Sequence, residues 1–179
     1  MGMFRAISFS VCLALAACGQ GAAPSDADAQ TAGEPSGEVS NAEKAAILAA
    51  LGASANAQGQ VENECGERVT PQFLAADVGP GVGRAVAYVI GGGPNMPSCY
   101  GDGSQLHLMR SADGGWREIH QHRGGGIIIL PTQHNNANDI ANGGPGFSFP
   151  VMEWNGSAYA NANRNVADSA LDGARFLPN

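Results

Sequence analysis

The chain has 179 residues, a formal net charge of −7 and only 6% aromatic residues. Lys44 is its only lysine, which excludes the basic surface that a nucleic-acid-binding protein needs to neutralise phosphates. The same acidic balance excludes electrostatic docking on an anionic bilayer. The length suits one domain once the terminal processing segments are set aside.

The first seventeen residues are typical of a secretory signal peptide. Arg5 supplies the positive end, and the apolar run that follows is too short to span a bilayer. The run ends in Leu15-Ala16-Ala17-Cys18, which resembles the lipobox of bacterial lipoproteins, where small residues precede the cysteine that is lipidated. This resemblance implies a lipoprotein signal over residues 1–17 and acyl chains on Cys18 that anchor the protein to a membrane. An ordinary signal peptide that contains Cys18 is the alternative.

Residue 19 bears on which membrane carries the anchor. Among lipoproteins, an aspartate at this position retains the protein at the inner membrane, whereas this chain has Gly19. We therefore expect an outer-membrane anchor facing the periplasm. Residues 18–39 are small, polar and acidic, so they predict a disordered tether with a root-mean-square reach of roughly 25 Å.

A helix is predicted to open the globular domain, residues 40–179. Ser40 and Glu43 match a capping box, an apolar run rich in alanine follows, and Gly52 ends it. Ile47, Leu48 and Leu51 fall on one face of this helix, which we expect to pack against a sheet.

The rest of the domain predicts strands separated by glycine-rich turns. Asn155-Gly156 between two aromatic-bearing runs indicates a hairpin, and the last fifteen residues predict a further helical turn or a strand around Phe176. We predict a mainly β or α+β fold, with one N-terminal helix packed on a twisted antiparallel sheet of about six strands. The predicted strands are 68–73, 84–90, 105–110, 116–122, 127–130, 147–154 and 157–161.

Two cysteines remain for the mature domain. Cys12 leaves with the signal and Cys18 carries lipid, so Cys65 and Cys99 are expected to form a disulfide in an oxidising periplasm. A metal pair or free thiols are the alternatives. Neither cysteine belongs to a C-x-x-C arrangement, so the sequence gives no support to redox catalysis.

The segment from Asp139 to Tyr159 carries a family resemblance. Its pattern D-I-x-x-G-G-P-G-F-x-F-P-V-x-x-W-N-G-x-x-Y resembles a family of uncharacterised secreted or lipid-anchored proteobacterial proteins. More distantly, the chain resembles FG-GAP-like repeats, whose acidic loop binds calcium. The corresponding loop, residues 77–83, has no acidic residue after Asp77, and a calcium site needs several oxygen ligands. The resemblance therefore implies a fold and a location, but no reaction and no cofactor.

Three histidines are candidate metal ligands. His120 and His122 lie two apart in a predicted strand, so their side chains share a face, and His134 follows at a distance in sequence. A polar outer strand face is the simpler interpretation. If residues 127–131 run back beside the preceding strand, His134 lies far from His122, so we expect no metal site on this face.

The longest polar segment inside the domain is a candidate binding loop. It contains His134, Asn135, Asn136, Asn138 and Asp139. Loops of this kind on a rigid sheet often bind partners.

Catalysis has little support in the sequence. The chain has no G-x-S-x-G nucleophile elbow, and Gly79-x-Gly81-x-Gly83 precedes a predicted strand instead of opening a helix as a nucleotide-binding loop does. Nothing favours Glu118, Asp139 or Glu153 as a glycosidase pair. We predict a non-catalytic, lipid-anchored envelope protein that binds an envelope protein or cell-wall component. An inhibitor or immunity-type protein acting on a cell-wall hydrolase is the first alternative, and a metal-binding module is the second.

Overall fold

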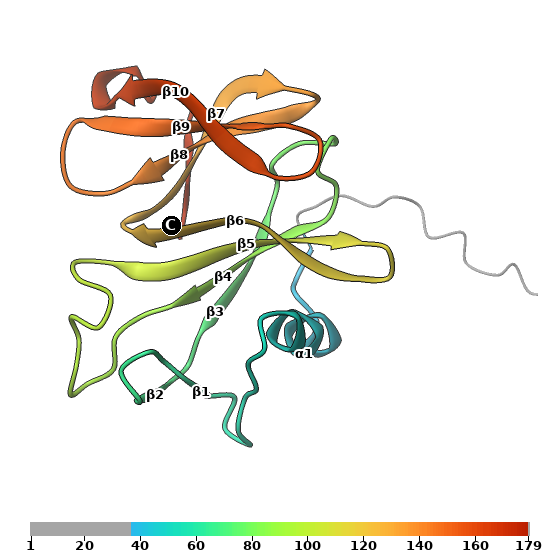
Figure 1. Cartoon of the computed structure of the whole chain (residues 1–179), viewed down its shortest axis with the longest axis vertical. Helices are drawn as coiled ribbons and strands as arrows, with labels where there is room; N and C mark the ends of the chain where they lie inside the picture. The colour runs from blue at the N-terminus through green and yellow to red at the C-terminus, as the bar shows by residue number, and fades with distance from the viewer. Residues whose placement is uncertain (1–36, 179) are drawn as a thin grey trace, which may run out of the picture. The chain divides into compact units, whose positions relative to one another are not determined.

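The computed structural model describes residues 37–178 (Figure 1). The predicted signal peptide, Cys18 and nearly all of the predicted tether lie outside the described residues. No helix within the described part is long and apolar enough to cross a membrane. Val39, which we assigned to the tether, is buried against helix and sheet residues. The folded domain therefore begins before Ser40, because this apolar side chain helps to fill the core.

Helix α1 (Asn41–Ala50) confirms the predicted capping box. The Ser40 hydroxyl accepts a hydrogen bond from the Glu43 backbone N–H at 3.2 Å, and the Glu43 carboxylate accepts one from the Ser40 N–H at 2.8 Å. Gly52 ends the helix with a φ of 69°, a conformation that side chains other than glycine rarely adopt. Arg84 pairs with Glu43 at 3.0 Å, which ties the start of the helix to the sheet.

A four-stranded antiparallel sheet lies against this helix (Figure 1). Its strand order is β3-β4-β5-β6, so β3 and β6 are its edges. Val61–Glu62 (β1) and Arg68–Val69 (β2) form a separate two-stranded ribbon. The strands of the sheet are β3 (Gln72–Ala76), β4 (Ala85–Ile90), β5 (Ser104–Ala112) and β6 (Gly115–Gly124).

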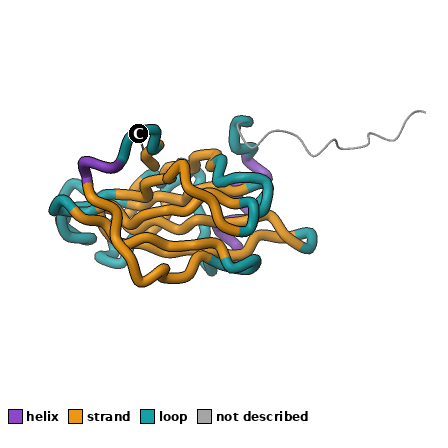
Figure 2. The backbone as a smooth tube through the Cα atoms, turned by 90° about the horizontal axis from the view of Figure 1, so that it is seen from above, coloured by secondary structure: helices purple, strands orange, loops and turns teal. Residues whose placement is uncertain are grey.

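A five-stranded sheet packs against the other face of the four-stranded one, and loops gather at both ends of the strands (Figure 2). Its order is β10-β9-β8-β7-β11, with every pairing antiparallel. The last segment supplies both structures predicted for it, a 3₁₀ turn (Asp168–Ala170) and strand β11 around Phe176. The strands are β7 (Gly126–His134), β8 (Ala137–Gly143), β9 (Ser148–Trp154), β10 (Tyr159–Ala167) and β11 (Arg175–Leu177).

Strand β4 shows why the domain has these layers. All six of its residues are buried. Ala85, Ala87 and Val89 face the core between the two sheets, whereas Val86, Tyr88 and Ile90 pack under the helix. Because successive side chains on a strand point to opposite faces, a strand that is apolar throughout needs cover on both sides.

The mainly β fold class with one N-terminal helix on a sheet is confirmed, but the prediction of one sheet of about six strands is wrong. The described residues form eleven strands in sheets of two, five and four. The apolar run at Ile127–Leu130 explains the difference. Ile127 and Ile129 fill the core between the sheets, and Ile128 and Leu130 fill a cluster on the outer face of the five-stranded sheet. One sheet with one covered face cannot bury both sets.

The glycines at 124–126 carry the chain from one sheet to the other. Gly125 alone separates β6 from β7, which belong to different sheets and do not form the hairpin considered above. Gly124 and Gly126 have φ values of 153° and 119°. A Cβ added to Gly126 would come within 2.3 Å of the Leu177 carbonyl oxygen. Glycine is required here for both the backbone angle and the close approach.

Cys65 and Cys99 form the predicted disulfide, with their Cα atoms 6.0 Å apart. The bond joins the β1–β2 ribbon to the loop that follows β4. Their separation of 34 residues corresponds to about 3.5–4 kcal/mol of stabilisation when the bond restricts the unfolded chain.

Candidate functional site: a charged cluster and an apolar end

The predicted binding loop is a tight hairpin. His134 pairs with Ala137 and Gln133 pairs with Asn138, so only Asn135 and Asn136 form the turn between β7 and β8. Their φ values are 51° and 60°, as in a type I′ turn, which joins two strands without splaying them. The prediction of a loop is therefore wrong. Asparagine tolerates these positive φ angles better than most residues. The strands on either side of the turn were not predicted, because their residues here are polar and show no apolar alternation.

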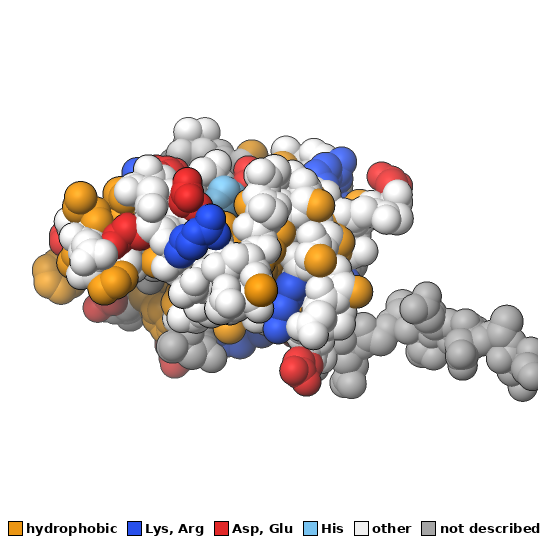
Figure 3. Space-filling view, turned by 90° about the horizontal axis from the view of Figure 1, so that it is seen from below, with side chains coloured by type: hydrophobic (Ala, Val, Ile, Leu, Met, Phe, Trp, Pro, Cys, Tyr) orange, Lys and Arg blue, Asp and Glu red, His pale blue; other side chains and the backbone are white. Residues whose placement is uncertain are grey.

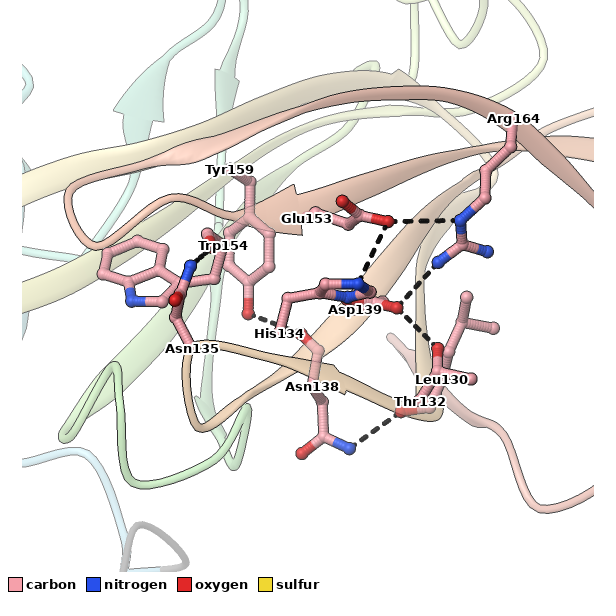
Figure 4. Close-up of polar contacts among 10 residues, drawn as sticks. All are labelled: Leu130, Thr132, His134, Asn135, Asn138, Asp139, Glu153, Trp154, Tyr159 and Arg164. Carbon is pink, nitrogen blue, oxygen red and sulfur yellow. Dashed lines mark hydrogen bonds and ion pairs between the residues drawn. The ribbon is translucent and has the colours of Figure 1, made fainter.

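Asp139 is the centre of a polar cluster beside this hairpin (Figure 4). Its carboxylate is fully buried. One oxygen accepts a hydrogen bond from His134 Nδ1 at 2.7 Å. The other accepts bonds from the Thr132 hydroxyl at 2.6 Å and from the Arg164 guanidinium at 2.8 Å. All these partners come from strands β7 and β10, so the buried charge joins three strands of one sheet.

Glu153 on β9 completes the cluster. Arg164 Nε lies 3.2 Å from Glu153 Oε1, and His134 Nε2 lies 3.5 Å from the same oxygen. The guanidinium of Arg164 thus bridges two carboxylates, and each nitrogen of the His134 ring faces a carboxylate. Asp139 shares a side of β8 with Ala141, which belongs to the cluster on the outer face of the five-stranded sheet. Figure 3, which views the domain from below, therefore shows the opposite face.

Further contacts fix the hairpin from both sides. Asn135 Nδ2 donates to the Trp154 carbonyl at 2.7 Å, and Asn138 Nδ2 donates to the Leu130 carbonyl at 2.8 Å (Figure 4). The Tyr159 hydroxyl donates to the Asn138 carbonyl at 2.9 Å. Burial, and then the charge of Asp139, raise the pKa of Tyr159, so this hydroxyl remains a hydrogen-bond donor.

The loop of residues 77–83 packs against the turn of the same hairpin. Gly81 N–H donates to the Asn136 carbonyl at 2.7 Å, and a Cβ on Gly81 would come within 2.3 Å of the Asn135 carbonyl oxygen. Asp77 pairs with Arg175 at 3.7 Å. The alternating glycines of this loop therefore allow close backbone packing.

The histidine candidates for a metal site are not brought together. His120 Nε2 lies 2.7 Å from Asn142 Oδ1, and His122 Nε2 lies 2.7 Å from the Gly143 carbonyl. They share a face as predicted, but that face contacts β8 of the second sheet. Burial lowers the pKa of His120, which favours its neutral form. Among the described residues, the group with metal-ligand types is His134, Asp139 and Glu153, whose ligand atoms lie within 4.8 Å of one another.

A second notable region is the apolar end beside the β8–β9 loop. This loop is Gly144-Pro145-Gly146-Phe147, and the Phe147 side chain is 83% exposed. A hollow of about 190 Å³ adjoins it, and Phe176, which is 48% exposed, forms part of its wall. The remaining lining residues are Gly125, Gly126, Ile127, Ile128, Gly143, Gly144, Phe149 and Leu177.

The sequence could reveal only part of these two regions. It singled out His134 and Asp139 as binding residues, but it missed Arg164, which lies 25 residues after Asp139 and closes the cluster. It also missed Phe147. The only signal for Phe147 was strand alternation, because Phe149 two positions later is buried on the sheet.

Fold and site together define an antiparallel β domain of two packed sheets, with a helix on one outer face and a partly neutralised charge cluster on the other. Comparisons with protein-family models, with curated proteins and with solved structures find no match for this chain.

Proposed function

We propose that this protein is a non-catalytic, lipid-anchored protein of the cell envelope that binds a protein partner through its apolar end. The anchor rests on the sequence pattern at Leu15-Ala16-Ala17-Cys18, and Gly19 favours the outer membrane. The acidic tether of residues 18–36 is long enough to separate the domain from the headgroups.

The exposure of Phe147 is the observation that carries the binding role. At 83% exposure the ring adds almost nothing to the stability of the domain, yet it stands on a loop of glycine and proline. Gly144 of this loop lines the same hollow as a second exposed aromatic residue, Phe176. Exposed aromatic side chains next to a hollow are typical of the central residues of protein interfaces.

The charged cluster supports binding without catalysis. Asp139 is saturated with hydrogen bonds, and both ring nitrogens of His134 face carboxylates, so neither is aimed at a nucleophile. Arg164 neutralises part of the negative charge. This arrangement stabilises the sheet and presents a rigid surface.

Capture from solubilised envelopes tests the role of Phe147. We expect Phe147→Ser to weaken retention of the partner roughly thirtyfold, which corresponds to the loss of about 2 kcal/mol from a buried aromatic contact. Met96→Ser is the matched control, because Met96 is 47% exposed on a different loop. Both variants should keep their unfolding free energy within about 0.5 kcal/mol. Equal retention by the wild type and by Phe147→Ser would contradict the proposal.

The identity and the activity of the captured partner distinguish an inhibitor of a cell-wall hydrolase from a protein that only binds its partner. Pro145, Gly146 and Phe147 are exposed, as a segment that enters a cleft must be. If the captured protein is a hydrolase, wild-type protein should lower its activity on isolated peptidoglycan, and Phe147→Ser should not.

A metal-binding role has one observation in its favour, the proximity of His134, Asp139 and Glu153. Arg164 already occupies both carboxylates, so a divalent ion would have to displace a cation. Calorimetric titration with zinc decides between the partner-binding role and the metal-binding role. Submicromolar binding that Glu153→Gln abolishes would replace the partner-binding proposal with a metal-binding one.

A further inference from the structure

Strand β3 is an open edge of the four-stranded sheet. It pairs with β4 alone, and no other backbone–backbone hydrogen bond of the described residues involves Gln72–Ala76. Half of its N–H and C=O groups therefore face away from the sheet. Proteins usually protect such an edge with charges, proline or a bulge, but Gln72–Ala76 contains no charged residue and no proline, and its pairing with β4 is regular.

A hollow of about 330 Å³ runs along this edge. Residues 72–75 form one wall, and Val39, Leu177 and Pro178 belong to the others. Leu177 follows Phe176 on β11, the edge strand of the second sheet, so the hollow lies between the edges of two sheets. A chain in extended conformation placed beside β3 would enter this space, because neighbouring strands lie about 4.8 Å apart.

A second hollow, of about 450 Å³, meets the first at Phe73. It lies between helix α1 and the loop that follows it, and Leu48 and several alanines make its lining apolar. Phe73 belongs to the cluster on the helix side of the sheet. The side chains of an added strand that point to this same side would enter the second hollow beside Phe73.

Lys44 gives the second hollow a charge. It lines the hollow, it is the only lysine of the chain, and none of the ion pairs among the described residues includes it. A carboxylate in this position would find a cation that has no ion-pair partner within residues 37–178.

We propose that β3 binds an extended segment of a partner protein as a fifth strand of its sheet. Backbone hydrogen bonds to the open edge of β3 hold the segment. One large apolar side chain fills the hollow beside Phe73, and a carboxylate on the same face of the segment pairs with Lys44. This site meets the apolar end only at Leu177, which lines both hollows, and it needs neither Phe147 nor the lipid anchor.

Nuclear magnetic resonance of the ¹⁵N-labelled whole chain carrying Cys18→Ala tests the site. The probe is a short peptide with blocked ends, alternating threonine and leucine, with one glutamate on the leucine face. It is made in two N-methylated forms, with methyl groups on alternate residues of either one edge or the other. We expect saturable shifts of the Gln72–Ala75 amides with one form and none with the other, because only one form keeps the donors that face β3.

Charge reversal tests the role of Lys44. Lys44→Glu should weaken binding of the active peptide up to about fivefold, and a peptide with lysine in place of glutamate should recover the loss. Arg117→Glu on the opposite edge strand β6 is the control and should leave the affinity unchanged.

Three outcomes would overturn the proposal. Equal binding of both N-methylated forms would mean that backbone pairing plays no part, and the absence of shifts at about 5 mM peptide would mean that the edge binds no strand. Concentration-dependent dimerisation of the free chain, with shifts confined to β3, would make a second copy the occupant.

Discussion

We expect Asp139→Asn to destabilise the domain more than any change in the exposed part of the same cluster. The substitution keeps the shape of the side chain and removes its charge. The asparagine amide can keep the bond to His134 or Thr132, but it presents an N–H group to the Arg164 guanidinium, which is also a donor.

The expected loss is about 2 kcal/mol of unfolding free energy. A hydrogen bond to a charged group contributes about 1.5–3 kcal/mol, and Asp139 is fully buried. Arg164 is 40% exposed and keeps Glu153 as a partner, so water compensates part of the loss. Complete loss of a buried partner without this compensation costs about 3–5 kcal/mol.

Urea denaturation at neutral pH with the disulfide intact measures this difference, and Glu153→Gln is the matched control. Glu153 accepts from the same guanidinium but is 32% exposed, so its loss should cost less than about 1 kcal/mol. Amide hydrogen exchange should accelerate at Ala137–Gly143 in Asp139→Asn and much less in the control. If Asp139→Asn costs no more than Glu153→Gln, the desolvation of the carboxylate cancels its pairing and Asp139 does not hold the hairpin.

Three further predictions concern the anchor, the disulfide and a buried histidine. Cys18→Ser should move the protein out of the membrane fraction or stall its processing, and continued outer-membrane fractionation would contradict the lipobox. Non-reduced peptide mapping should recover Cys65 linked to Cys99, and Cys99→Ala should lower stability by about 3.5–4 kcal/mol, whereas two alkylatable thiols in periplasmic protein would contradict the bond. Burial lowers the pKa of His120 in the folded protein below its value of about 6.5 in the unfolded chain. Below about pH 6.5 the unfolded chain therefore binds more protons than the folded one. The free energy of unfolding should fall as the pH drops through this range, by at most about 1.4 kcal/mol per pH unit. His120→Gln should flatten this dependence, and equal slopes for both proteins in urea melts between about pH 6.5 and 5 would show that His120 is not its source.

The sequence determined the elements whose signals are local. The capping box at Ser40 and Glu43 depends on residues three apart, and the structure places the helix where it predicts. The β-rich character of the chain was also readable, because apolar alternation and turn residues act over a few positions. Cysteine counting identified the Cys65–Cys99 pair, since these two cysteines remain when the predicted signal peptide and the predicted lipidation site are set aside.

The tertiary structure decided how these elements form layers. Strand β8 has the sequence Ala-Asn-Asp-Ile-Ala-Asn-Gly, in which Ile140 is the one β-branched residue and no residue is aromatic, although both kinds are typical of strands. It becomes a strand because β7 and β9 pair with it on both sides and because small residues fit the crowded interior. No local pattern contains this information.

The predicted site differs from the observed site for the same reason, because contacts between strands are not visible in a local sequence pattern. Asp139, Glu153 and Arg164 come from three different strands, and only the register of the sheet brings their side chains into contact. Residue type alone marked His134 and Asp139 as polar, and the fold turned a predicted loop into a fixed hairpin. The exposure of Phe147 and the open edge of β3 likewise depend on which surfaces the folded chain leaves uncovered.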